Sequence, residues 1–172
     1  ADPGNRLLWH HAPVRLEAEL IRDALLAVGG TLDNAMFGPS VLDNSVRRSI
    51  YLRVKRSELL PVMTIFDAPE PTASIGERSV TTVPSQALAM MNSPFVRQQA
   101  EKLADRVAKS AGSDSAQAVD QAFRIALARA PTRTEAARLS AFLDQAAAGG
   151  AADARRKALA EACHTILCLN EF

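Results

Sequence analysis

The sequence predicts a mostly α-helical domain, in which a C-terminal helix bundle is joined to a basic extended segment and a long proline-containing loop. Three observations predict this class. Apolar residues recur at helical spacing over the C-terminal half, with capping residues between the runs. Alanine is abundant and arginine outnumbers lysine sixteen to four, and both Ala and Arg favour helices. With six Phe, one Tyr and one Trp among 172 residues, the core must consist of small aliphatic side chains, which suits close helix packing.

The first expected helix spans residues 13–29. Its apolar residues largely follow the helical period, and Gly29 and Gly30 supply a stop signal. Residues 31–44 contain a Gly-Pro-Ser run and two Asn residues, so they are predicted to form a turn-rich connection.

Residues 47–56 alternate between apolar and polar side chains. Ile50, Leu52 and Val54 fall on one side of an extended chain, while Tyr51 and the basic residues fall on the other. This pattern favours a short strand or an extended arm. A helix remains the alternative, because Arg and Leu favour helices and no breaker occurs before Pro61.

A proline-containing loop is expected after the brief apolar stretch at residues 59–66. Pro69 and Pro71 impose extended or turn backbone on the residues that precede them. Residues 72–83 show no periodicity and lead to Pro84, which suits the first turn of a helix.

The remaining chain predicts four or five helices. The run Asn92-Ser93-Pro94 predicts a kink or a tight turn between two of them, with Ser93 as the N-cap of the second. Asp114 with Gln117, and Thr132 with Glu135, have the spacing of capping boxes. Gly149 and Gly150 are expected to end one helix, and residues 155–171 to form the last.

Length and charge restrict the class of protein. A chain of 172 residues is expected to form a single domain over residues 1–172. The formal net charge of +1 argues against a nucleic-acid-binding protein. No apolar run is long enough to span a bilayer, and the N-terminus lacks a signal pattern. Because the chain begins with Ala1, we expect a segment of a longer precursor.

The residues that could carry chemistry do not form a known catalytic motif. Cys163 and Cys168 are expected to be reduced core residues, since their spacing on a helix is poor for a disulfide. His164 lacks the additional ligands that a zinc or haem site needs, so no metal and no cofactor are predicted. A non-catalytic role is therefore favoured for this chain.

Candidate binding residues lie in the basic segment and in the proline-containing loop. They are Arg47, Arg48, Tyr51, Arg53, Asp67, Glu70, Arg78 and Asn92. The arginines could hold a polyanion or a glycan, and the two acids could face a ligand from a stiff loop. The interpretation favoured on chemical grounds is internal pairing. We expect Arg47, Arg48 or Arg78 to pair with Asp67 or Glu70 and to hold the loop near Asn92.

Several short motifs, taken in order, carry a family resemblance. They are Asp2–Trp9, Leu16–Asp23, Arg47–Tyr51, Phe66–Pro69, Thr82–Val96 and Leu169–Phe172. Together they resemble the planctomycete-type domain of unknown function (DUF1553, PSD-type), which usually forms the last module of large multidomain proteins. One departure is the run Ala128–Pro131, where a Gly-Arg-Pro-Pro type run is common. We expect this departure to alter a helix turn only.

The resemblance implies a context for the chain. Such domains follow a cytochrome-c-like module in exported proteins, so haem would belong to an upstream module. The expected function is an interaction or scaffold module of an exported or periplasmic protein, with the upstream modules or another protein as partner. Two alternatives stay open: a carbohydrate- or polyanion-binding site within an enzyme assembly, and a docking surface for the cytochrome-c-like module.

Overall fold

Helices dominate the part of the chain that the computed structural model describes, which is residue 2 and residues 4–10, 14–55, 59–72, 74–148 and 152–172. Within that part there are seven α-helices and one short 3₁₀ turn, and no strand longer than an isolated bridge. The elements are α1 (Ala18–Val28), η1 (Ser49–Tyr51), α2 (Pro61–Ile65), α3 (Pro84–Asn92), α4 (Pro94–Ala111), α5 (Ser115–Leu127), α6 (Arg133–Ala148) and α7 (Ala152–Leu167). The predicted mostly α-helical class is confirmed.

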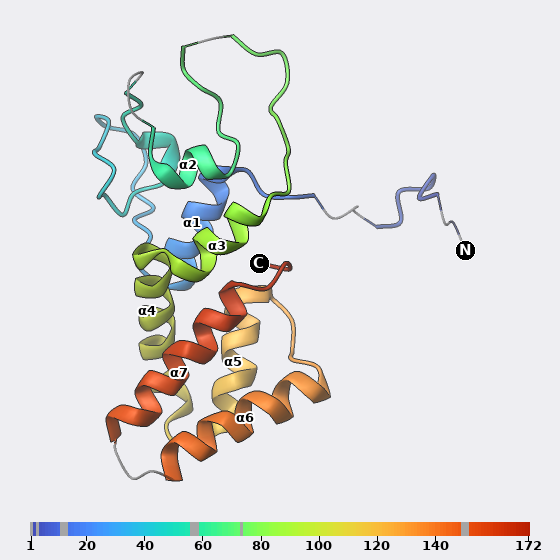
Figure 1. Cartoon of the computed structure of the whole chain (residues 1–172), viewed down its shortest axis with the longest axis vertical. Helices are drawn as coiled ribbons and strands as arrows, with labels where there is room; N and C mark the ends of the chain where they lie inside the picture. The colour runs from blue at the N-terminus through green and yellow to red at the C-terminus, as the bar shows by residue number, and fades with distance from the viewer. Residues whose placement is uncertain (1, 3, 11–13, 56–58, 73, 149–151) are drawn as a thin grey trace.

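The C-terminal helices form the expected bundle. Helix α4 packs against α7 and α5, and α6 packs against both α5 and α7 (Figure 1). Helix α4 also contacts α1 and α3, which carry the N-terminal part of the fold. Helix α4 therefore connects the bundle to the region that contains the basic segment and the loop.

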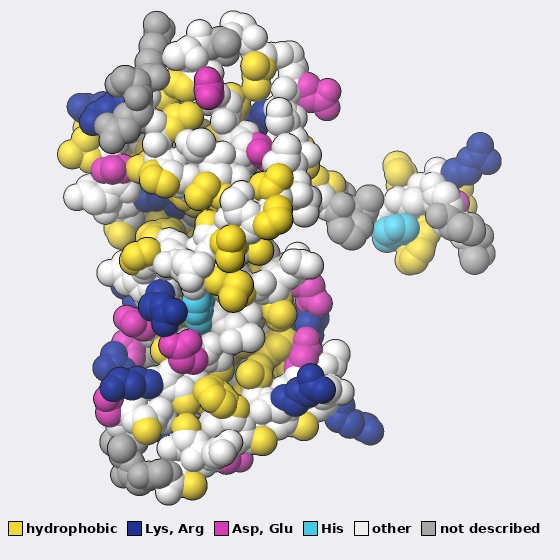
Figure 2. Space-filling model, in the orientation of Figure 1, with side chains coloured by type: hydrophobic (Ala, Val, Ile, Leu, Met, Phe, Trp, Pro, Cys, Tyr) yellow, Lys and Arg dark blue, Asp and Glu magenta, His cyan; other side chains and the backbone are white. Residues whose placement is uncertain are grey.

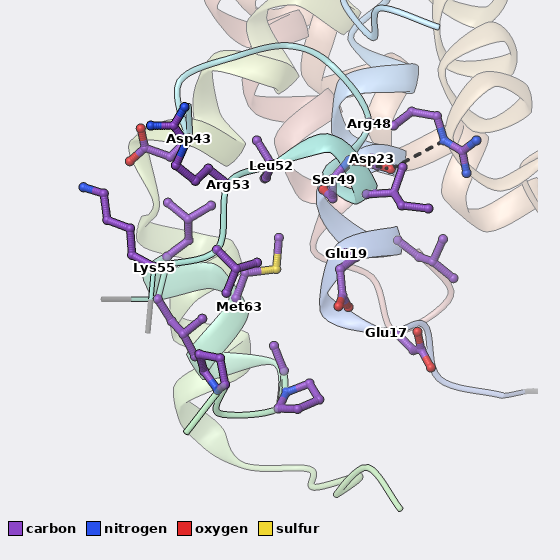
Figure 3. A pocket seen from close by; sticks show the side chains of 18 of the residues that line it. Glu17, Glu19, Asp23, Asp43, Arg48, Ser49, Leu52, Arg53, Lys55 and Met63 are labelled. Carbon is purple, nitrogen blue, oxygen red and sulfur yellow. Dashed lines mark hydrogen bonds and ion pairs between the residues drawn. The ribbon is translucent and has the colours of Figure 1, made fainter. Parts of the chain in front are cut away.

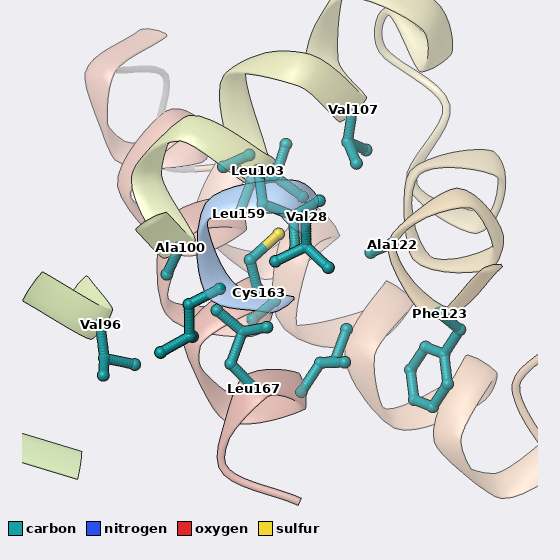
Figure 4. Close-up of a cluster of buried hydrophobic side chains, with 14 of the residues drawn as sticks. Val28, Val96, Ala100, Leu103, Val107, Ala122, Phe123, Leu159, Cys163 and Leu167 are labelled. Carbon is teal, nitrogen blue, oxygen red and sulfur yellow. The ribbon is translucent and has the colours of Figure 1, made fainter. Parts of the chain in front are cut away.

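Small aliphatic side chains fill the core, as the scarcity of aromatic residues requires. Leu103 and Val107 of α4, Cys163 and Leu167 of α7 are fully buried, and Phe123 of α5 closes one end of the cluster (Figure 4). Burying one such side chain stabilises a fold by roughly 1.5–3 kcal/mol. The predicted apolar stripe of α4 is entirely buried. On α6 only Leu143 of its predicted face is fully buried, and Phe142 is 44% exposed.

The predicted helix boundaries in this half are largely confirmed. Ser93 separates α3 from α4, although its side chain makes no capping hydrogen bond. Thr132 and Glu135 form a complete capping box, in which each backbone N–H donates to the other side chain. Asp114 accepts from the Gln117 N–H. Helix α7 ends at Leu167, earlier than expected, and residues after it form turns.

Helix α1 begins five residues later than the sequence pattern indicates. Glu17 has extended backbone at ψ 156°, and residues 14–17 lead into the helix as an extended strip. This conformation places Arg15 against the proline-containing loop, 3.4 Å from the Asp67 carboxylate. Gly29 and Gly30 end the helix as predicted, and Gly30 adopts a positive φ of 72° that suits a residue without Cβ.

The basic segment is extended, as preferred, and the helical alternative survives only as the single turn η1. Of the three apolar residues predicted to share one side, Leu52 packs partly buried against the core, whereas Ile50 and Val54 are 75% and 63% exposed. The Val41 N–H of the turn-rich connection donates to the Tyr51 carbonyl, and the Arg53 N–H donates to the Val41 carbonyl. These contacts are isolated bridges, so the segment does not belong to a sheet.

The proline-containing loop is irregular, as predicted, and projects beyond α2 and α3 (Figure 1). The apolar stretch before it forms the short helix α2. Among the residues of these predictions, Pro13, Arg56, Gly149 and Gly150 lie outside the described residues.

Candidate functional site

An apolar groove lies between α1, the basic segment and α2. Its volume is about 640 Å³, within the range of small-ligand and peptide pockets. Twelve of the described lining residues are apolar: Leu20, Leu42, Ile50, Leu52, Val54, Leu59, Leu60, Pro61, Met63, Ala68, Pro69 and Pro71. Four of these side chains, Leu20, Leu42, Ile50 and Val54, are between 45% and 75% exposed. The groove thus presents large aliphatic side chains to solvent.

Two consecutive residues of α1 hold the wall of this groove. The Arg22 guanidinium, 4% exposed, donates to the Arg47 carbonyl at 3.0 Å, the Ser49 hydroxyl at 3.2 Å and the Ser45 carbonyl. Asp23 accepts from the Ser49 N–H and hydroxyl at 2.8 and 2.7 Å. Burial lowers the pKa of Arg22 from its ordinary value. A buried polar cluster thereby fixes the basic segment to α1, in addition to the packing of Leu52 against the core.

An acidic rim borders the groove on the α1 side. Arg78 of the loop donates to both oxygens of Glu19 at 2.9 and 3.0 Å and to Glu17 at 3.1 Å. The hydrogen bond from Arg78 lowers the pKa of the Glu19 carboxyl. These contacts tie the loop to the start of α1 and neutralise part of the acidic charge there.

Basic side chains border the opposite rim. Arg53 and Lys55 lie there beside Asp43, facing α1 across Leu52 and Met63 (Figure 3). Arg53 reaches Ser40 at 3.5 Å. The groove therefore has an apolar floor. Its α1 edge carries Glu17, Glu19 and Asp23 with Arg48 and Arg78 paired to them, and its opposite edge carries Arg53 and Lys55 beside Asp43.

Three of the eight residues proposed from the sequence line this groove, namely Arg48, Arg53 and Arg78. Arg47 and Tyr51 serve the neighbouring loop instead. The Arg47 guanidinium lies 4.2 Å from the centre of the Tyr51 ring and donates to the carbonyls of Ala35 and Phe37 at 2.9 and 2.6 Å. The Tyr51 hydroxyl accepts from the Phe37 N–H. This pair fastens the turn-rich connection to the basic segment.

The expected pairing of loop acids with these arginines is wrong in its partners. Asp67 pairs with Arg15 and accepts from the Thr81 N–H and hydroxyl, both at 2.8 Å. The Thr81 hydrogen bonds, more than Arg15, lower the pKa of Asp67. Arg78 turns to Glu17 and Glu19 because the extended start of α1 brings those carboxylates to the loop.

The anchor of the loop on α3 also differs from the expected one. Gln86, in the first turn of α3, donates to the carbonyls of Ile65 and Thr81 at 3.0 and 3.2 Å. Asn92 lies at the opposite end of that helix and is exposed, as is Glu70. Thr81 and Gln86 therefore perform the fastening that was expected of Glu70 and Asn92.

Sequence reasoning missed the apolar floor of the groove and the roles of Arg22 and Glu19. The alternation at Ile50, Leu52 and Val54 was the available signal, but it also fits a core-facing strand. Nothing local marks Arg22 as buried, since it lies in an ordinary amphipathic helix.

The groups with potential reactivity lie away from the groove. Cys163 and Cys168 are both free thiols, as expected, and burial raises the pKa of Cys163 to about 12. His164 is bound to the Met90 carbonyl at 3.1 Å. Across the described residues, no group of three or more His, Cys, Asp or Glu side chains is arranged to hold a metal ion. In the same residues no helix has the length and apolarity to cross a bilayer.

A comparison with known protein families shows to which family the chain belongs. The family described as "Protein of unknown function (DUF1553)", PSD1, matches residues 1–143. The chain belongs to this family. No curated protein and no solved structure matches it. The DUF1553 match contains every residue named here as lining the groove, and it ends within α6. Helix α7 and the motif Leu169–Phe172 lie beyond it.

Proposed function

We propose that this DUF1553 domain is a protein-interaction module that binds an apolar segment of a partner protein in the groove. The observation that carries the proposal is the exposure of large aliphatic side chains within a concave surface, at Leu20, Leu42, Ile50 and Val54. Contiguous exposed apolar surface of this kind is typical of interaction sites. The partners to test first are the upstream modules of the same exported precursor.

The charges around the groove favour a protein segment over a polyanion. Arg78 is engaged by Glu17 and Glu19, and Arg22 by a carboxylate and backbone carbonyls. A polyanion would have to displace these acids or bind next to them, at an electrostatic cost. In a bound apolar peptide with polar ends, the side chains would pack on the groove floor and the polar ends would contact the charged rims.

A binding titration with purified upstream modules tests the proposal. Ile50→Glu and Val54→Glu place a charge on the groove floor at exposed positions, so they should fold normally and weaken binding about tenfold or more. Val80→Glu is the matched control, since Val80 is also 75% exposed but lies outside the groove. Equal affinity of the wild type and the three variants for the upstream modules would contradict the proposal.

A glycan panel run in parallel separates the rival functions. Binding of an anionic glycan that is lost in Arg53→Ala and retained in Ile50→Glu would favour the carbohydrate or polyanion site. Binding restricted to a haem-containing module and abolished by high salt, with no effect of Ile50→Glu, would favour the docking surface for a cytochrome-c-like module.

A further inference from the structure

The N-terminal arm, defined as residue 2 with residues 4–10, carries three consecutive exposed large apolar residues. Leu7 and Leu8 are each 82% exposed and Trp9 is 69% exposed. The arm lies apart from the body of the molecule, with hydrophobic side chains on its surface (Figures 1 and 2). Three adjacent large apolar residues without a covering element form a patch that is characteristic of a binding anchor.

The arm is preorganised by its own polar groups. Asp2 accepts from the Leu7 N–H at 2.7 Å, and its carbonyl accepts from the Trp9 indole at 3.2 Å. Asn5 donates to the His10 carbonyl at 2.7 Å. Holding the backbone in one shape lowers the entropy lost when the side chains dock. The side chains of Asp2 and Asn5 are thus used internally, and those of Leu7, Leu8 and Trp9 stay exposed.

The chemistry of the arm complements the groove on the same chain. Leu7, Leu8 and Trp9 match an apolar floor, and Arg6, which precedes them, matches the acidic rim. Glu17 on that rim is 56% exposed and meets Arg78 through one oxygen, Oε2, so a second cation can approach. An ion pair between Arg6 and Glu17 would therefore place Leu7, the first residue of the Leu7–Trp9 run, at the α1 edge of the groove.

We propose that the arm of one copy occupies the groove of a second copy, so that two chains exchange arms. This inference rests on the proposed function, because it names the occupant of the same groove. The arm extends away from its own body, which favours a second chain over its own groove (Figure 1). In a reciprocal exchange each groove is filled by the arm of the other chain, so the assembly is a closed dimer.

Trp9 is the one tryptophan of the chain, so its fluorescence reports the position of the arm. The expected result is a concentration-dependent shift of emission to shorter wavelength, as the indole leaves water, in step with dimer formation in analytical ultracentrifugation. Ile50→Glu should abolish both changes, and Val80→Glu should retain them. Circular dichroism verifies that both variants are folded.

A mixing experiment distinguishes exchange between chains from closure within one chain. The Trp9→Ala chain has an intact groove and no tryptophan, and the Ile50→Glu chain has an intact arm and a blocked groove. Mixing them should shift the emission of Trp9, because one arm still enters one groove. Failure of this shift, or a short-wavelength emission from monomers at every concentration, would overturn the exchange.

The two proposals fail separately. If the chain stays monomeric with long-wavelength emission while the upstream modules bind in an Ile50-dependent manner, the second copy is ruled out as the occupant and the interaction function stands. If neither the upstream modules nor a second chain binds in that manner, both proposals fall.

Discussion

Asp23 and Ser49 join α1 to the basic segment through two short hydrogen bonds, at 2.8 Å from the Ser49 N–H and 2.7 Å from its hydroxyl. The same carboxylate lies 3.5 Å from the buried Arg22 guanidinium. Asp23 therefore balances a buried cation and positions one wall of the groove.

Replacing Asp23 should be among the most damaging single changes in the N-terminal part of the fold. Asp23→Ala leaves the Arg22 charge buried without its counter-ion, and breaking a buried pair in this way costs about 3–5 kcal/mol. Urea unfolding measures the change in the free energy of unfolding.

Arg48→Ala is the matched control for this prediction. Arg48 also pairs with Asp23, but at 4.0 Å and with a side chain 46% exposed. Its loss should cost about 0–1 kcal/mol. Similar unfolding free energies for the two variants would show that Asp23 has no special structural role.

The loop acid Asp67 should stabilise the fold through its charge. Asp67→Lys removes the acceptor of the Thr81 hydrogen bonds and repels Arg15, so the melting temperature should fall. Asp67→Asn should have a smaller effect, because an amide oxygen still accepts from Thr81 and Asn tolerates the positive φ of 62° at this position.

Glu70→Lys serves as the control, since Glu70 lies in the same loop and is exposed. It should leave the melting temperature unchanged. A drop equal to that of Asp67→Lys would mean that the loop responds to net charge alone, and the specific Asp67–Thr81 contact would lose its assigned role.

The C-terminal bundle could be predicted from the sequence because its information is local. Stripes such as Leu103 and Val107 repeat at the helical period, and the Thr132 and Glu135 capping box is legible within four residues. Both features were confirmed, since burial of one face and capping of one end are properties of a single helix.

The groove could not be predicted because its contacts join residues that are distant in sequence. Arg22 and Ser49 are separated by 27 positions, and Arg78 and Glu19 by 59. An arginine offers the same local pattern whether it is solvated or bonded to carbonyls of another segment. The exposed Ile50 likewise has the same local pattern as a core residue until the position of α1 is known.

The capping box of α6 should make stability depend on pH. Hydrogen bonds from Arg129, and next from Thr132, hold the pKa of Glu135 at about 2, against 4.5 ordinarily. Because the folded-state pKa is depressed, the stabilisation is fully present above about pH 4.5 and is lost as pH falls toward 2. Thermal melts between pH 2 and 6 measure this loss.

Glu135→Gln should lower the melting temperature at pH 6 and flatten its decline between pH 4.5 and 2. Glu70→Gln, which changes an exposed acid outside any capping box, should keep the wild-type profile. A Glu135→Gln profile parallel to that of the wild type would refute the contribution of this carboxylate.

Ala128→Gly should stabilise the protein. Ala128 follows α5 in the left-handed conformation, with φ 54° and ψ 20°, where a Cβ atom costs about 1–2 kcal/mol. The residue is exposed, so the substitution removes no core packing. The added freedom of glycine in the unfolded chain offsets about 0.4–1 kcal/mol of this, which leaves a net gain between about 0 and 1.6 kcal/mol.

The control for this substitution is Ala141→Gly, at an exposed position inside α6. There glycine relieves no strain and should cost about 1 kcal/mol of helix stability. Urea unfolding of both variants should therefore give changes of opposite sign. A loss of stability in Ala128→Gly would show that the left-handed turn after α5 carries no strain that glycine relieves.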